Sequence, residues 1–199
     1  MIRYLAFSLI SYLLLASSCS TKIISNNYYQ LQKETVDNIE SRYEKLNAQK
    51  PFAIAFTDKE LTILSIEMIS DTLTRIYEFN IAEQKLADTL WKYNYDTAGI
   101  YYLIRKMKQT KVTWINSVDY YVNDQPQQLI YLSIKPITIR YLFSPPKYVA
   151  LGYFRTAQSF DEKGRLLDNR RTKRIRKIKG QVFYKITDRI CYTITEKYR

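Results

Sequence analysis

The amino-acid sequence predicts an α+β fold that is mostly antiparallel β, with one N-terminal helix followed by many short strands. Apolar residues recur at helical spacing between residues 31 and 46, and they alternate in short runs from Phe52 onward. Tyrosine supplies 19 of the 199 residues, and it is enriched in strands because its ring suits a pleated, half-buried surface. These patterns leave open whether the sheet is a curled sheet, an open barrel or a sandwich.

The N-terminal helix is predicted over residues 27–48. Its apolar positions are five, three, four and three residues apart, which is close to one helical face. Asn26 or Asn27 can cap its start, and Lys50–Pro51 ends it because a residue before proline avoids the helical region. The apolar positions of this face are Leu31, Val36, Ile39, Tyr43 and Leu46.

Short runs of β-branched and aromatic residues predict the strands, and polar turns separate them. The clearest turns are Asn123–Pro126 and Asp161–Gly164. Pro136 and Pro145–Pro146 bracket a further extended piece. The predicted strands cover residues 52–56, 61–69, 72–81, 112–122, 129–134, 148–154, 181–187 and 190–195.

Two segments fit more than one type of secondary structure. Residues 82–95 are compatible with a helical turn or with another strand. Between residues 100 and 107 the apolar residues follow the 0, 3, 4, 7 spacing of a helix, although Tyr101–Tyr102 also suits a sheet. The spacing slightly favours a helix there, with Asp96 or Thr97 as its N-cap.

The composition excludes several classes of catalytic and cofactor site. The chain contains no histidine, which removes Ser-His-Asp and Cys-His catalysis and histidine-ligated metal sites. Two cysteines are too few for a cysteine-only metal site. The four glycines, Gly99, Gly152, Gly164 and Gly180, lie too far apart in the sequence to form the glycine-rich loops that cradle phosphates. We therefore expect no cofactor.

An enzyme of this composition would have to rely on paired carboxylates, as glycosidases do. Glu67 with Asp71, or Asp119 with Asp124, are the pairs that the sequence offers. Neither pair has a distinctive context, and turn or solvent-facing positions explain these residues better. A further alternative is a small-ligand carrier with a tyrosine-lined pocket.

The first 19 residues have the three-part pattern of an export signal. Arg3 provides the positive start, and the apolar run of residues 4–16 is too short to span a membrane comfortably. The following stretch, Leu15-Ala16-Ser17-Ser18-Cys19, resembles the lipobox of bacterial lipoproteins. This resemblance implies cleavage before Cys19 and attachment of lipid to its sulfur; an uncleaved signal anchor and an ordinary signal peptide are the alternatives.

The resemblance divides the chain into a signal peptide at residues 1–18, a lipidated tether at 19–26 and a single β-rich domain at 27–199. It implies export and a lipid anchor in the cell envelope. Ser20, in place of aspartate, favours the outer membrane in bacteria that have one. With lipid on Cys19, Cys191 has no partner for an intrachain disulfide.

Positive charge is concentrated near the C-terminus. The chain carries a net charge of +12, and residues 163–199 hold 13 Lys or Arg against three acidic residues. Such a cluster predicts contact with anionic lipid, lipopolysaccharide or acidic polysaccharide, whereas a solvated strand edge is the alternative. Nucleic acid is the weakest candidate, because no aromatic residue lies between residues 169 and 180. The cluster consists of Arg170, Arg171, Lys173, Arg174, Arg176, Lys177 and Lys179.

These features together predict a membrane-anchored lipoprotein whose domain is a non-enzymatic binding or structural module. Its partners would be the membrane, through the lipid on Cys19, and an anionic surface, through the C-terminal basic cluster.

Overall fold

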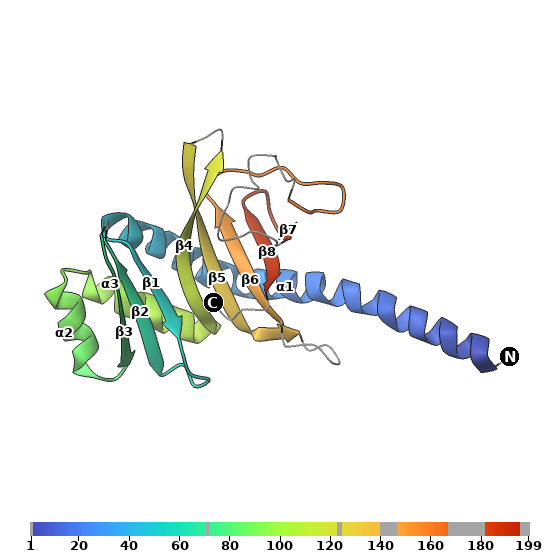
Figure 1. Ribbon diagram of the computed structural model, residues 1–199, viewed down its shortest axis with the longest axis horizontal. Coiled ribbons are helices and arrows are strands. Elements are labelled where there is room, and N and C mark those ends of the chain that lie inside the picture. The colour runs from blue at the N-terminus through green and yellow to red at the C-terminus, as the bar shows by residue number, and fades with distance from the viewer. Residues whose placement is uncertain (1, 71, 123–124, 140–146, 167–181, 196–199) are drawn as a thin grey trace.

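The computed structural model describes residues 2–70, 72–122, 125–139, 147–166 and 182–195 (Figure 1). For residues 2–21, 120–122, 125, 126, 135–139 and 147 it describes the backbone alone. The described residues form three helices and eight strands in this order: α1 Ile2–Gln49, β1 Phe52–Phe56, β2 Ile63–Ile69, β3 Thr74–Asn80, α2 Gln84–Lys92, α3 Thr97–Thr110, β4 Val112–Val122, β5 Gln125–Ile139, β6 Lys147–Phe154, β7 Phe183–Lys185 and β8 Ile190–Thr195.

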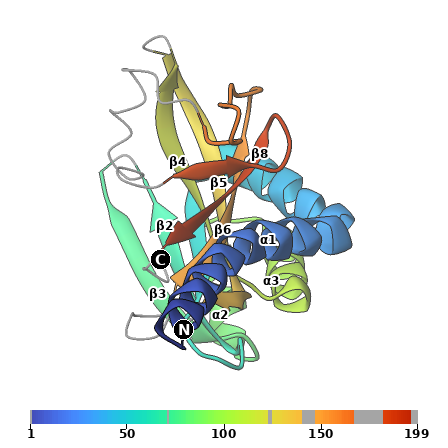
Figure 2. The same ribbon diagram turned by 90° about the vertical axis from the view of Figure 1, so that its right-hand side faces the viewer.

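The eight strands form one antiparallel sheet in the order β3-β2-β1-β4-β5-β6-β8-β7. The sheet is strongly twisted (Figure 2). Among the described strands, β3 and β7 form its two open edges. The predicted α+β class is therefore confirmed, with an N-terminal helix followed by an antiparallel sheet. The described strands form a single sheet that does not close, and this excludes a sandwich of two sheets among the arrangements that the sequence left open.

Helix α1 confirms most of the predicted helical face. Val36, Ile39 and Tyr43 are fully buried, but Leu31 is 81% exposed. The reason is geometric: a step of five residues turns the helix by about 500°, which places Leu31 well away from Val36. Tyr29, seven residues before Val36, takes the buried position instead.

The ends of α1 follow the prediction on one side only. The helix ends at Gln49, where the side chain of Asn47 accepts a hydrogen bond from the Phe52 amide at 3.0 Å. At its start, α1 continues without a break through residues 19–26, where we expected a polar tether. Ser25, one helical turn before Tyr29, is already fully buried.

The ambiguous segment at residues 82–95 contains helix α2, whose Leu86 and Leu90 are fully buried one turn apart. The helix slightly favoured around residues 100–107 is confirmed as α3. Its N-cap is Asp96, whose side chain accepts a hydrogen bond from the Gly99 amide at 2.8 Å. A Cβ atom at Gly99 would lie 2.9 Å from Cδ2 of Leu46, so glycine permits α3 to approach α1 closely.

Helices α1 and α3 pack in antiparallel directions. Three contacts along their length show this: Arg42 with Asp96 at 3.4 Å, the Tyr102 hydroxyl with Asn38 at 2.9 Å, and the Tyr28 hydroxyl with the Thr110 carbonyl at 2.7 Å. Residue numbers rise along α3 as they fall along α1. The C-terminal end of α3 therefore points toward the N-terminal part of α1.

Strand β5 is longer than predicted at both ends, because it begins at Gln125, inside the turn predicted over residues 123–126, and continues through Pro136 to Ile139. Its register with β6 shifts between Ile134 and Thr138, on either side of this proline. Proline lacks the amide hydrogen that a regular ladder uses, so it is tolerated in a sheet at such an irregularity. The predicted turn at residues 161–164 is present, with Gly164 at a φ of 72°.

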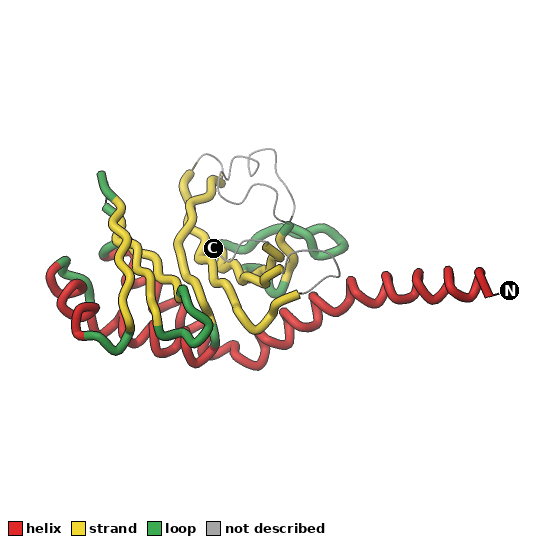
Figure 3. Tube along the Cα trace, turned by 60° about the horizontal axis from the view of Figure 1, so that its bottom comes forward, coloured by secondary structure: helices red, strands yellow, loops and turns green. Residues whose placement is uncertain are grey.

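Apolar side chains cover both faces of the sheet. One face, with Ile54 and Leu132, belongs to the main core, which also contains Val36 of α1 and Leu103 of α3. The helices lie on one side of the strands in Figure 3. On the other face of the sheet, a second apolar cluster contains Val118, Leu129, Tyr131, Ala150, Phe154, Phe183 and Cys191.

Cys191 is fully buried in this second cluster and is not part of a disulfide. Burial raises the pKa of its thiol to about 12, and the charge of Lys185 opposes this shift. A buried thiol of this kind is unreactive at neutral pH, because the thiolate is the nucleophilic form.

Candidate functional site

The residues singled out from the sequence do not form one described site. Cys19 lies within α1, where only the backbone is described. The seven basic residues between Arg170 and Lys179 lie outside the described residues. So do Asp71 and Asp124, and the two carboxylate pairs therefore cannot be placed.

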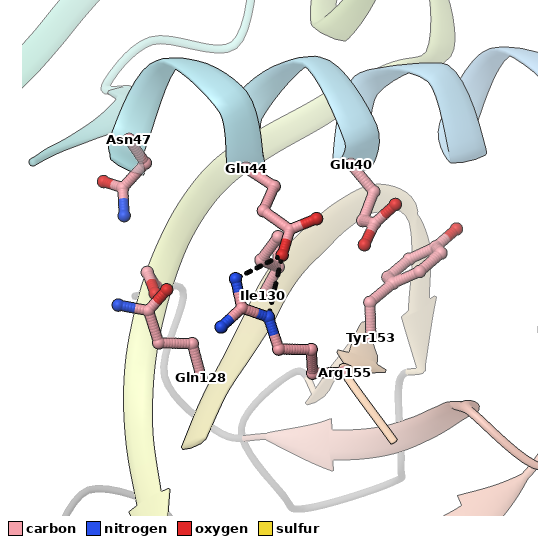
Figure 4. Close-up of a pocket in the computed structure, with 8 residues that line it drawn as sticks. Glu40, Glu44, Asn47, Gln128, Ile130, Tyr153 and Arg155 are labelled. Carbon is pink, nitrogen blue, oxygen red and sulfur yellow. Dashed lines mark hydrogen bonds and ion pairs between the residues drawn. The ribbon is translucent and has the colours of Figure 1, made fainter. Parts of the chain in front are cut away.

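The structure instead contains a small pocket between α1 and strands β4, β5 and β6 (Figure 4). Sequence analysis did not select any of its residues. Asp37, Glu40 and Glu44 are three and four residues apart, which places them on one stripe of α1. This stripe faces the sheet. The pocket is lined by Glu40, Glu44, Asn47, Ser117, Gln128, Ile130, Tyr153 and Arg155.

Asp37 lies at one end of this stripe and accepts hydrogen bonds from two tyrosines. The Tyr29 hydroxyl lies 3.2 and 3.3 Å from its two carboxylate oxygens, and the Tyr153 hydroxyl lies 3.2 Å from Oδ1. Tyr29 is 1% exposed and Tyr153 is 4% exposed. Burial, reinforced by the charge of Asp37, raises the pKa of Tyr29 to about 12 and that of Tyr153 further still. Both hydroxyls therefore stay protonated, and Asp37 ties α1 to β6.

Glu44 forms an ion pair with Arg155 at the other end of the stripe. Its Oε1 accepts from Nε of Arg155 at 3.1 Å and lies 3.0 Å from a terminal guanidinium nitrogen. The two side chains are 36% and 54% exposed, and exposed pairs of this kind contribute at most about 1 kcal/mol. The contact orients Arg155 across the pocket more than it stabilises the fold.

Glu40 lies between Asp37 and Glu44 on this stripe. Burial raises its pKa, and the charges of Glu44 and Asp37 raise it further, whereas Arg189 opposes the shift. A raised carboxyl pKa is typical of a general acid in catalysis. Glu40 thus has one property of a catalytic residue.

The dimensions of the pocket favour a structural role for these carboxylates. Its interior volume of about 10 Å³ is close to the minimum for one water molecule, whereas ligand pockets measure roughly 300–1,000 Å³. The Ser117 hydroxyl is buried beside this space without a protein partner. A single water hydrogen-bonded to Ser117 would satisfy this group, and a space of this volume does not enclose a substrate.

We expect Glu40→Gln to raise the free energy of unfolding at pH 7. The folded state raises the pKa of Glu40, so its ionised form costs stability at a pH above the raised pKa. The gain in the free energy of unfolding should be complete above that raised pKa. It should vanish as the pH falls below 4.5, the ordinary pKa of a glutamate. Urea unfolding between pH 3.5 and 8 measures it. The exposed Glu34→Gln on the same helix is the control, and a variant less stable than the parent at pH 7 would contradict the argument.

Among the residues whose side chains are described, no group of three His, Cys, Asp or Glu is placed to hold a metal ion. No helix in the described part of the chain is both long and apolar enough to cross a membrane. Comparison with protein-family models, with curated proteins and with solved structures finds no match to this chain.

Proposed function

We propose that the protein is an exported bacterial lipoprotein, anchored to a membrane of the envelope through lipid on Cys19. Its folded domain acts as a non-enzymatic binding or structural module, and its C-terminal basic cluster contacts an anionic surface. The single observation that carries the proposal is the stretch Leu15–Cys19, which follows a positive residue and a short apolar run.

The position of Cys19 relative to the domain supports a short anchor. Ser25 is the first buried residue among the described side chains, and it follows Cys19 by six positions. At 1.5 Å per residue, six helical residues cover about 9 Å. An acylated Cys19 would therefore hold the domain beside the bilayer. The small volume of the pocket beneath α1 supports a non-enzymatic role.

Cys19→Ala should abolish lipidation and processing of the full-length chain expressed in a bacterium. The variant should accumulate as an unprocessed precursor or as soluble protein, because the sulfur that carries the lipid is missing. Mass spectrometry of the membrane fraction should show an acylated Cys19 at the N-terminus of the parent protein alone.

Cys191→Ala is the matched control, since it removes the other cysteine and should leave processing and membrane retention intact. If Cys19→Ala is processed and retained like the parent, the lipid anchor is wrong. If the parent itself keeps residues 1–18 in the membrane fraction, the segment is an uncleaved signal anchor.

A further inference from the structure

The C-terminal end of α3 carries a second basic cluster, formed by Arg105, Lys106, Lys108 and Lys111 and called here the α3 basic end. Helix α3 contains no acidic residue, and none of the described ion pairs involves these four cations. Three of them, Arg105, Lys108 and Lys111, are exposed. Cations favour the end of a helix because of its dipole, but that effect is confined to the last turn and does not account for Arg105.

The antiparallel packing of α1 and α3 directs this cluster toward the anchor. The Tyr28 hydroxyl donates a hydrogen bond to the carbonyl of Thr110, the last residue of α3, at 2.7 Å. Tyr28 follows Cys19 by nine positions, or about 14 Å along the helix axis. When the helix is tilted toward the bilayer, Tyr28 lies less than this distance above the level of Cys19. With screening lengths of about 8–10 Å at physiological salt, the α3 basic end is then within electrostatic reach of lipid headgroups.

The segment of α1 between Cys19 and Tyr28 adds apolar contact area to the same end of the molecule. Ile23 is 54% exposed and Ile24 is 44% exposed, and Lys22 beside them is exposed as well. Exposed aliphatic side chains next to basic ones are typical of helices that lie at a membrane interface. Both isoleucines lie only four and five positions after the lipid-bearing residue.

We propose that the α3 basic end, together with Lys22, Ile23 and Ile24, is a docking surface for anionic phospholipid. The proposal rests on the proposed function, because the lipid on Cys19 is what brings this end to a bilayer. The surface would fix the orientation of the domain, with α3 directed at the membrane and α2, at the other end of the molecule, directed away (Figure 1).

The test uses the lipidated protein reconstituted in vesicles and a fluorophore next to the cluster. Gln109→Cys provides the attachment site, since Gln109 is exposed, Cys19 is blocked by lipid and Cys191 is buried. Headgroup spin-labelled lipid quenches the fluorophore when it is close to the bilayer. Quenching should be strong on vesicles with phosphatidylglycerol, weak on pure phosphatidylcholine, and reversed by high salt.

Removing charge from the α3 basic end should abolish the difference between the two vesicle types. Each basic residue near an anionic membrane contributes about a fivefold factor, so Arg105→Gln with Lys108→Gln and Lys111→Gln should shift the docked-to-undocked ratio about a hundredfold. The matched control is Lys45→Gln with Lys85→Gln and Lys92→Gln, which removes the same charge away from this end and should leave quenching unchanged. Circular dichroism verifies that each variant is folded.

The outcomes separate this inference from the proposed function. A protein that never acquires lipid on Cys19 refutes the anchor. An anchored protein with equal quenching on both vesicle types, or with quenching unaffected by the α3 variant, refutes the docking surface and leaves the anchor standing. Loss of quenching with Arg171→Gln, Arg174→Gln and Lys177→Gln, but not with the α3 variant, assigns docking to the C-terminal cluster and also overturns the inference.

Discussion

Phe52→Ala should lower the free energy of unfolding by about 3–5 kcal/mol, the usual range for truncating a fully buried aromatic side chain. Phe52 has no exposed surface, and its ring meets those of Tyr43 at 5.1 Å and Tyr95 at 6.0 Å, both edge to face. It therefore joins α1, β1 and the segment before α3. Truncation would leave a cavity where these elements meet, because the surrounding rings can collapse only partly.

Urea unfolding followed by circular dichroism measures the loss. Leu31→Ala is the control, since Leu31 is 81% exposed and its truncation should change stability by less than about 0.5 kcal/mol. A similar effect for the two variants would mean that Phe52 is not in the core.

Asp37→Ala should cost about 2–4 kcal/mol, although Asp37 itself is only partly buried. Its removal leaves the hydroxyls of Tyr29 and Tyr153 without their acceptor inside the protein. Each buried polar group without a partner costs about 1–3 kcal/mol. Asp37→Asn keeps one acceptor oxygen and should cost less than the alanine variant.

A combined variant distinguishes this explanation from a simple loss of packing. Replacing Tyr29 and Tyr153 by phenylalanine in the Asp37→Ala background removes the orphaned hydroxyls, so stability should recover in part. Thermal unfolding of the single, double and triple variants gives the coupling free energy between Asp37 and the two tyrosines. Losses that add without any recovery would show that the three side chains do not act as one network.

Helix α1 combines two tasks that ordinarily belong to separate segments. Its buried face, with Val36, Ile39 and Tyr43, forms part of the main core. Its first half extends away from the sheet as a single rod (Figure 1) and contains Cys19. If Cys19 is lipidated, the anchor and the core are joined by continuous helix, and rotation of the domain relative to the membrane would be restricted. This restriction makes a docked orientation such as the one proposed for α3 attainable with few contacts.

Sequence patterns alone determined the class of the fold and most of its elements. Lys50–Pro51 predicted the end of α1, and helical spacing predicted the existence of α3. Runs of β-branched and aromatic residues predicted strands that match β1, β2, β3, β4, β6 and β8 closely. These properties depend on which face of a local segment is apolar, so neighbouring residues contain the information. The exclusion of histidine chemistry is likewise a property of composition.

The tertiary structure alone decided which segments lie together. Strand order, the antiparallel packing of α3 on α1, and the approach of Tyr153 to Asp37 across 116 positions of sequence depend on contacts between distant segments. The acidic residues of α1 illustrate the difference, since helical spacing places Asp37, Glu40 and Glu44 on one stripe but does not say whether that stripe meets the sheet. Burial against other elements settles that question, because the apolar area removed from water outweighs the preference of any single residue.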